Sequence, residues 1–149
     1  MASRVHIQNR QRRRRIDRTR LARLVERVLT AEGMPADRGV TVVLLRDAPM
    51  ARLNVRYRDR EGPTDVLSFP SDPVGWPAEE PRPLGEVVVS IDRACEQAGR
   101  RDQALEAELA RLVVHGVLHL LGYLDDTRAA RARMRRQENR YLRGPGKRR

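Results

Sequence analysis

The chain of 149 residues has little cysteine, few aromatic side chains and no long apolar run. Its one cysteine, Cys95, excludes an intramolecular disulfide and a zinc site of three or four cysteines, so we expect a reducing, cytoplasmic location. No segment approaches the roughly 18 to 20 apolar residues that span a bilayer, and no apolar stretch follows the first arginines as in a secretory signal. Phe, Trp and Tyr make up 3% of the residues, which disfavours extensive base stacking.

Positive charge is abundant and lies at two ends of the chain. The net charge is +11, and Lys147 is the one lysine among 31 basic residues. Residues 1–20 carry +7 and residues 128–149 carry +9, whereas residues 21–127 carry −5. Clustered arginine binds phosphate and gains affinity from counterion release, so both ends favour a nucleic-acid partner. Solvated tails without a partner are the alternative, and few large apolar residues near the C-terminus argue against a membrane anchor.

Apolar periodicity predicts a single α+β domain with a small, mixed sheet of about four strands and helices around it. An Arg-rich segment with the first strand (residues 1–20) precedes the main body (21–142) and a basic tail (143–149). Strands are predicted at residues 5–8, 39–45, 65–69 and 85–91, and helices at 21–32, 47–57, 92–98, 103–121 and 126–142. Gly99 is expected to stop the third of these helices, and Gly122 to cap the fourth.

The segment HGVLHLLGYLDD, which begins at His115, carries the candidate chemistry. His115 and His119 are four residues apart, so a helix places both imidazoles on one face, within reach of one metal ion. Gly122 permits a sharp reversal that can return Asp125 or Asp126 toward them. Three protein ligands and water form the usual catalytic zinc arrangement. The alternative is that both histidines are satisfied core residues of an apolar helix.

Gly116 follows His115 at the position where the metallopeptidase version of this helix has a glutamate as general base. A peptidase is therefore disfavoured. A metal ion can still acidify water and polarise a phosphoryl oxygen. Together with the basic ends, this indicates phosphodiester hydrolysis.

Three ordered blocks resemble the YbeY family of single-domain metallo-endoribonucleases. The histidine segment is similar to the family signature His-Gly-x-Leu-His-Leu-x-Gly-Tyr-Asp-His. A second block consists of LN at 53–54, YR at 57–58 and PTDVLSFP at 63–70, and the third is LGEVVVS at 84–90, where the family usually has LGDIVIS. The likeness extends from about residue 53 to residue 142.

The resemblance implies roles for individual residues. His115 and His119 are expected to bind the metal and act in catalysis, beside a cleft lined by Arg58, which would clamp a phosphate or stabilise charge in the transition state. The family has a third histidine where this chain has Asp125. A carboxylate is an accepted zinc ligand, so we predict Asp125 as the third ligand of one Zn²⁺, with other divalent ions tolerated. Asp126 in its place, or a degenerate site, are the alternatives.

The resemblance also implies a biological setting. Residues 21–142 would form a zinc-dependent hydrolase domain that cleaves single-stranded RNA during rRNA maturation and small-subunit quality control in the cytoplasm. The expected partners are RNA, above all the rRNA of the small ribosomal subunit, and small-subunit ribosomal proteins. A catalytically weak RNA- or ribosome-binding factor is the first alternative, and a metalloprotease, which Gly116 disfavours, is the second.

Overall fold

The computed structural model describes residues 4–58 and 64–143, without the side chains of Tyr57 and Arg58. Every predicted element is present, with ends that differ from the prediction by at most three residues. The elements are β1 Val5–Asn9, α1 Arg18–Ala31, β2 Val40–Leu45, α2 Asp47–Arg58, β3 Val66–Pro70, β4 Gly85–Ser90, α3 Ile91–Arg100, α4 Leu105–Leu120 and α5 Arg128–Arg143. None of the helices in these residues is long and apolar enough to cross a membrane.

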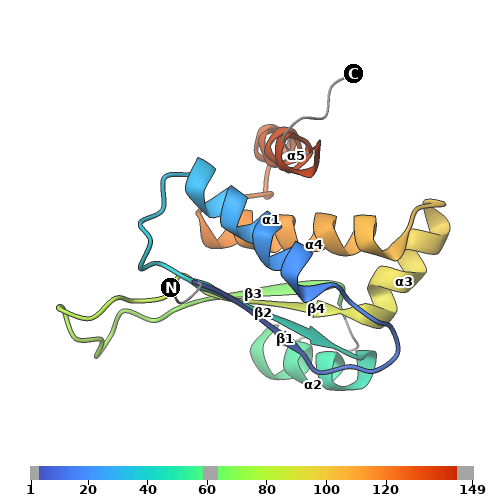
Figure 1. Cartoon of the computed structure of the whole chain (residues 1–149), viewed down its shortest axis with the longest axis horizontal. Helices are drawn as coiled ribbons and strands as arrows, with labels where there is room; N and C mark the ends of the chain where they lie inside the picture. The colour runs from blue at the N-terminus through green and yellow to red at the C-terminus, as the bar shows by residue number, and fades with distance from the viewer. Residues whose placement is uncertain (1–3, 59–63, 144–149) are drawn as a thin grey trace.

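The four strands form one mixed sheet in the order β1-β2-β4-β3 (Figure 1). β1, β2 and β4 are parallel, and β3 runs antiparallel to β4 at one edge. Branched apolar residues dominate the two central strands, β2 (VTVVLL) and β4 (GEVVVS), as expected for strands covered on both faces. The prediction of a single α+β domain with a small mixed sheet is therefore confirmed.

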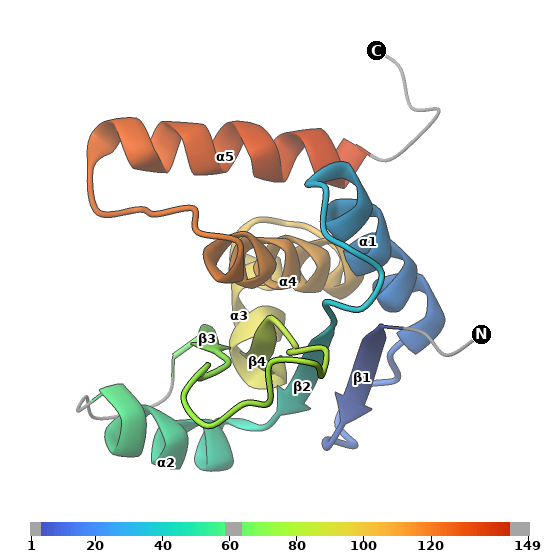
Figure 2. The same cartoon turned by 90° about the vertical axis from the view of Figure 1, so that its left-hand side faces the viewer.

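Side chains of the central strands alternate between two apolar cores. One core lies between the sheet and the helices α1 and α4, and the other lies between the sheet and α2 (Figure 1). Val42, Leu44, Val87 and Val89 belong to the first core, and Val43, Leu45 and Val88 to the second. Helix α5 lies outside the α1–α4 layer and runs crosswise to α4 (Figure 2).

Helix α4 packs unusually close to β3 and β4 at Gly116. A Cβ atom on Gly116 would lie 2.5 Å from Cγ1 of Val87 and 3.2 Å from Cγ2 of Val66, which is too near for an unshifted neighbour. The Ser68 hydroxyl donates to the Gly116 carbonyl at 2.9 Å and ties the helix to β3. The packing thus explains why this position has no glutamate, which would need space that the sheet occupies.

Helix α3 ends two residues later than predicted, because Gly99 does not stop it. A glycine ends a helix where the chain takes a positive φ, and Gly99 is not among the positive-φ residues. The helix continues to Arg100, and the backbone turns at Asp102, which has a φ of 53°. The prediction that Gly99 ends this helix is therefore wrong.

Candidate metal centre

Helix α4 positions His115 and His119 as a pair on its solvent-facing side. One helical turn separates them, so both rings project from the same face. Their Nε2 atoms are 3.1 Å apart, and the ring centroids are 4.7 Å apart in an edge-to-face arrangement. About a quarter of each side chain is exposed, 24% for His115 and 27% for His119. The pair is thus open to a ligand on one side and supported by the helix on the other.

A Schellman motif at the end of α4 returns the chain toward the histidines. Gly122 has a φ of +101°, and its N–H donates to the His119 carbonyl at 3.0 Å. The Tyr123 N–H donates to the Leu118 carbonyl, also at 3.0 Å. These two bonds are the ones that define the motif, in which the left-handed position favours glycine. The predicted role of Gly122 as a cap is therefore confirmed.

The reversal brings Asp125 to the histidine pair. Its Oδ2 atom lies 3.3 Å from Nε2 of His119 and 3.7 Å from Nε2 of His115. The three ligand atoms all lie within 4.8 Å of one another, a group that could hold a metal ion. Asp126, the other candidate for the third position, is exposed and is not a member of this group. The structure therefore places Asp125, rather than its neighbour, beside the imidazoles.

Hydrogen bonds on the far side of each ring set its tautomer. Nδ1 of His119 lies 3.0 Å from the Tyr123 carbonyl oxygen, which can only accept, so this nitrogen carries the proton. Nδ1 of His115 lies 2.5 Å from a carboxylate oxygen of Glu138, and the same reasoning applies. In the neutral rings, both Nε2 atoms then present lone pairs. The two lone pairs and the carboxylate oxygen are directed at one point and repel one another. A bound cation would remove this repulsion.

Glu138 is the functional residue that sequence reasoning missed. It is buried on α5, and its carboxylate accepts a hydrogen bond from the ring of His115. A signal for it exists in the sequence, because Met134, Glu138 and Tyr141 follow helical spacing and the other two are apolar core residues. A lone acid in the buried stripe of a helix needs a partner inside the protein. The identity of that partner, a histidine 23 residues earlier, was not predictable from spacing.

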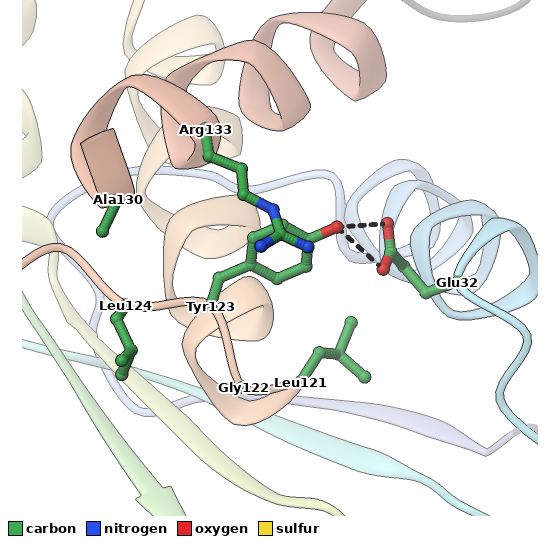
Figure 3. Close-up of a pocket in the computed structure, with 7 residues that line it drawn as sticks. All are labelled: Glu32, Leu121, Gly122, Tyr123, Leu124, Ala130 and Arg133. Carbon is green, nitrogen blue, oxygen red and sulfur yellow. Dashed lines mark hydrogen bonds between the residues drawn. The ribbon is translucent and has the colours of Figure 1, made fainter.

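A second, half-buried carboxylate anchors the loop that carries Asp125. The Tyr123 hydroxyl donates to both oxygens of Glu32 at 3.1 and 3.2 Å (Figure 3). Gln137 and the Tyr141 hydroxyl, both from α5, donate to Glu32 as well. Burial raises the pKa of both tyrosines, and the Glu32 charge raises it further, so the hydroxyls remain donors at neutral pH. The end of α1 and helix α5 therefore fix the position of Tyr123, whose carbonyl orients His119.

A hollow of about 350 Å³ lies beside this loop. It is lined by Glu32, residues 121–124, Ala130 and Arg133, and the Arg133 guanidinium lies over the Tyr123 ring at 5.4 Å from its centroid (Figure 3). The predicted phosphate ligand Arg58 ends α2, and its side chain lies outside the described residues. The two histidines and Asp125 thus form a half-exposed group that could hold a cation, and Arg133 places positive charge on one side of it.

Comparisons with known proteins agree with this geometry. The family described as Endoribonuclease YbeY matches residues 6–145. A protein of that name from Moorella thermoacetica is 39% identical over 87% of this chain and 86% of its own length. The one from Pelotomaculum thermopropionicum is 43% identical over 82% of each chain.

A solved structure adds the fold. The solution structure of a Thermotoga maritima protein has a TM-score of 0.66 and 25% identity, and the match covers 97% of this chain and 99% of that one. Family match, relatives and fold coincide over nearly the same residues. The chain therefore belongs to the YbeY family of endoribonucleases.

Proposed function

We propose that this chain is a zinc-dependent endoribonuclease that cleaves single-stranded RNA. The observation that carries the proposal is the convergence of two imidazole Nε2 atoms and the Asp125 carboxylate, with both Nδ1 atoms already engaged. Two imidazoles and one carboxylate suit Zn²⁺, and three protein ligands leave a coordination position open, as catalytic zinc sites do. The names of the relatives support RNA as the substrate.

Each residue of the site has a distinct role in this proposal. His115, His119 and Asp125 would hold the ion, which supplies Lewis acidity toward water and a phosphoryl oxygen. Glu138 orients the ring of His115, and the Tyr123 carbonyl orients the ring of His119, each by accepting a hydrogen bond from Nδ1.

Arg58 remains the proposed phosphate-positioning residue, on the strength of the family resemblance. Its guanidinium would hold the scissile phosphate by two parallel hydrogen bonds.

The proposed setting is the maturation of rRNA and the quality control of the small ribosomal subunit, in the cytoplasm. The partners would be small-subunit rRNA and small-subunit ribosomal proteins. Co-sedimentation of the protein with purified small subunits tests this part, and protein that stays entirely unbound at low salt would count against it.

One observation favours an alternative function. Asp125 stands where the family has a histidine, and 48% of its side chain is exposed. An exposed carboxylate is well solvated and binds zinc less tightly than an imidazole in the same place would. A chain with a weak site would be an RNA- or ribosome-binding factor rather than a nuclease.

Metal content and RNA cleavage, measured on the same preparations, test the proposal. Untagged protein purified without chelator should contain about one zinc ion per chain by mass spectrometry, as a catalytic three-ligand site predicts. It should cleave single-stranded RNA, lose activity in chelator, and regain activity with zinc. His119→Ala should abolish both zinc retention and cleavage.

His6→Ala is the matched control, because His6 is an exposed histidine on β1 outside the site. It should retain both zinc and activity. Protein that binds no zinc even after addition, yet binds RNA, would replace the nuclease with the binding factor. Cleavage of casein but not RNA would instead identify a protease.

A further inference from the structure

Helix α5 has a charge distribution that its role in the fold does not require. Its sequence, RAARARMRRQENRYLR, contains seven arginines and one acid. The acid, Glu138, is buried against His115, so it does not neutralise the outer surface. All seven arginines are exposed: Arg128, Arg131, Arg133, Arg135, Arg136, Arg140 and Arg143. We call these side chains the α5 arginine face.

No arginine of the α5 arginine face forms an ion pair with a carboxylate among the described residues. Arg131 donates to the backbone carbonyl of Asp125 at 3.4 Å, and Arg133 and Arg140 lie over tyrosine rings. The remaining four have no partner in residues 4–58 and 64–143. Like charges four residues apart, such as Arg131 with Arg135, destabilise a helix. An anionic partner would remove this repulsion.

The α5 arginine face begins next to the candidate metal centre. Arg131 contacts the backbone of Asp125, and Arg133 borders the hollow beside Tyr123. Glu138, on the inner side of the same helix, holds His115. Figure 2 shows α5 running crosswise over α4. A polyanion on this face would therefore reach, at Arg131, the loop that carries Asp125.

We propose that the α5 arginine face is the surface on which the phosphate backbone of the RNA substrate lies. The proposal rests on the proposed nuclease function and extends it by naming the docking surface. Arginine binds phosphate through two parallel hydrogen bonds, and a 16-residue helix extends about 24 Å, enough for several phosphates. Sequence-independent contacts of this kind suit a surface with few exposed aromatic residues.

A membrane surface fits the same helix less well. Its large apolar residues, Met134 and Tyr141, are buried against the rest of the protein. The exposed positions between the arginines are Ala129 and Asn139, which offer no side chain for insertion among lipid tails.

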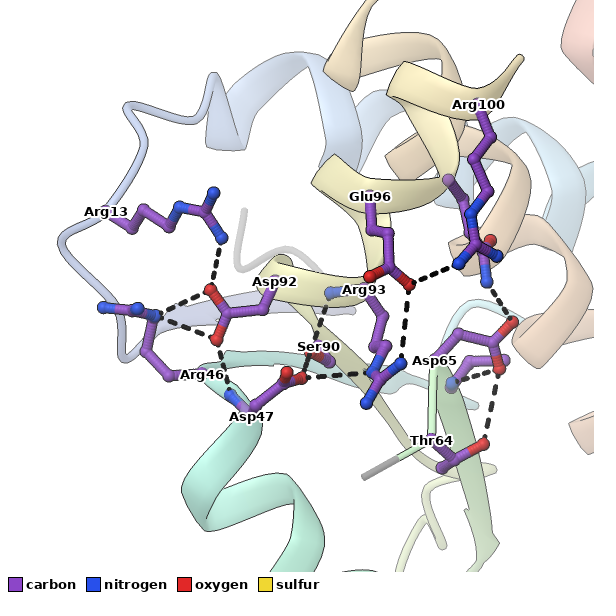
Figure 4. Close-up of polar contacts among 12 residues, drawn as sticks. Arg13, Arg46, Asp47, Thr64, Asp65, Ser90, Asp92, Arg93, Glu96 and Arg100 are labelled. Atoms are coloured by element: carbon purple, nitrogen blue, oxygen red, sulfur yellow. Dashed lines mark hydrogen bonds and ion pairs between the residues drawn. The ribbon is translucent and has the colours of Figure 1, made fainter. Parts of the chain in front are cut away.

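The other basic end differs in place and in charge balance. Arg13 and Arg46 both bind the Asp92 carboxylate (Figure 4). Arg10 donates to Gln8. In Figure 1 the segment between β1 and α1 lies beside α3, at the opposite end of α4 from the histidines. Positive charge in that segment is therefore partly neutralised and remote from the site.

The test compares two double charge reversals. Arg128→Glu with Arg135→Glu alters one stripe of α5, because seven residues make two helical turns. Arg12→Glu with Arg15→Glu is the matched control, since both residues are exposed and have no partner in the described chain. Each pair lowers the net charge equally. Both are made in the His119→Ala background, so that cleavage does not consume the probe.

The readout is the affinity for a fluorescent unstructured RNA, from anisotropy, between about 50 and 200 mM salt. The α5 pair should weaken binding at least tenfold and lower the slope of log Kd against log salt by about 1.4, which is two phosphate contacts of about 0.7 each. The control pair should change the affinity and the salt slope by less than half as much as the α5 pair does. Equal effects of the two pairs, or none from the α5 pair, overturn the proposal.

Three further cases are covered: the partner is a membrane, the variant unfolds, or the wild-type protein does not cleave RNA. Vesicles of anionic phospholipid replace the RNA, and loss of vesicle binding with unchanged RNA binding would assign the face to a membrane and overturn the proposal. If the Glu pair unfolds, Arg128→Gln with Arg135→Gln takes its place, with half the change in charge. Wild-type protein that fails to cleave RNA but binds it through α5 refutes the nuclease and retains the docking surface.

Discussion

Two polar clusters of this molecule, one around Asp92 and one around His115 and His119, satisfy their hydrogen bonds in opposite ways. In the Asp92 cluster, Arg13 and Arg46 donate to Oδ1 at 2.5 and 3.0 Å (Figure 4). Oδ2 accepts from the Asp47 N–H at 2.7 Å. Donors and acceptors therefore match, and the cluster joins the segment after β1, the start of α2 and the start of α3.

In the histidine cluster, by contrast, acceptors face acceptors. The Nδ1 atoms of both rings are bonded outward, so the Nε2 atoms and the Asp125 carboxylate are directed at one another. Polar groups normally find hydrogen-bond partners in the protein or in water. A cluster with matched partners satisfies itself within the fold, whereas these convergent acceptors form a group that could hold a metal ion.

The two clusters should differ most clearly when one of the converging acceptors is removed. Asp125→Ala should lose zinc and lower RNA cleavage more than about 100-fold, because even residues that only orient zinc ligands contribute about 10- to 100-fold. Asp126→Ala, the adjacent acid, should retain zinc and stay within about twofold of wild type, as exposed substitutions outside a site do. The measurements are zinc content and initial cleavage rate. Zinc loss in the Asp126 variant instead would move the third ligand by one residue.

Glu138→Gln tests whether the outward bonds matter. The amide can still accept from Nδ1 of His115, but it lacks the negative charge of the carboxylate beside the ring. Zinc affinity should fall about 10- to 100-fold in a competition titration with a chromogenic chelator. Glu106→Gln, an exposed acid in the first turn of α4, should leave the affinity unchanged. Equal affinities in all three proteins would show that Glu138 is only a packing residue.

Gly116→Ala tests the support beneath the histidines. The added methyl would meet Val87 on β4, and such overpacking costs about 1 to 3 kcal/mol in unfolding free energy. Gly99→Ala is the matched control in α3, because nothing lies within 4 Å of the added Cβ atom. It should be neutral or stabilising by up to about 1 kcal/mol. Urea unfolding of the zinc-free proteins measures both, and a stable Gly116 variant would mean that α4 can shift away from the sheet.

Asp92→Asn tests the matched cluster, where the smallest effect is expected. Burial by itself raises the pKa of Asp92, but the Asp47 N–H and the guanidinium groups of Arg46 and Arg13 outweigh it, so the net pKa is lowered. The unfolded chain then binds the proton more readily. The stabilisation is present above the ordinary carboxyl pKa of about 4 and is lost as the pH falls through the lower folded value.

The Asn variant should therefore be about 1 kcal/mol less stable at neutral pH, by urea unfolding, and should lose less of its stability on acidification below about pH 4. Zinc content at neutral pH should match that of wild type, since the cluster lies away from the site. Parallel pH profiles of the two proteins would show that Asp92 is not responsible for the acid sensitivity.

Most of the fold was predictable because its elements depend on local periodicity. The run of branched apolar residues in GEVVVS favours a strand, the helical spacing from Leu21 to Leu29 favours a helix, and the structure agrees. Gly122 was also predictable, since its left-handed φ closes a motif formed by neighbouring residues. Gly99 was not, because whether a glycine ends a helix depends on the packing around it, which its neighbours in sequence do not specify.

The sequence by itself determined that two imidazoles share one helix face and that a carboxylate follows a chain reversal. It left the choice between Asp125 and Asp126 open, because a turn that differs by one residue changes which carboxylate reaches the imidazole rings. Only the tertiary structure brought Glu138 to His115 and Glu32 to Tyr123, across 23 and 91 residues of chain. Such pairs form when helices pack, and helix packing depends on the shape of the whole core rather than on any local pattern.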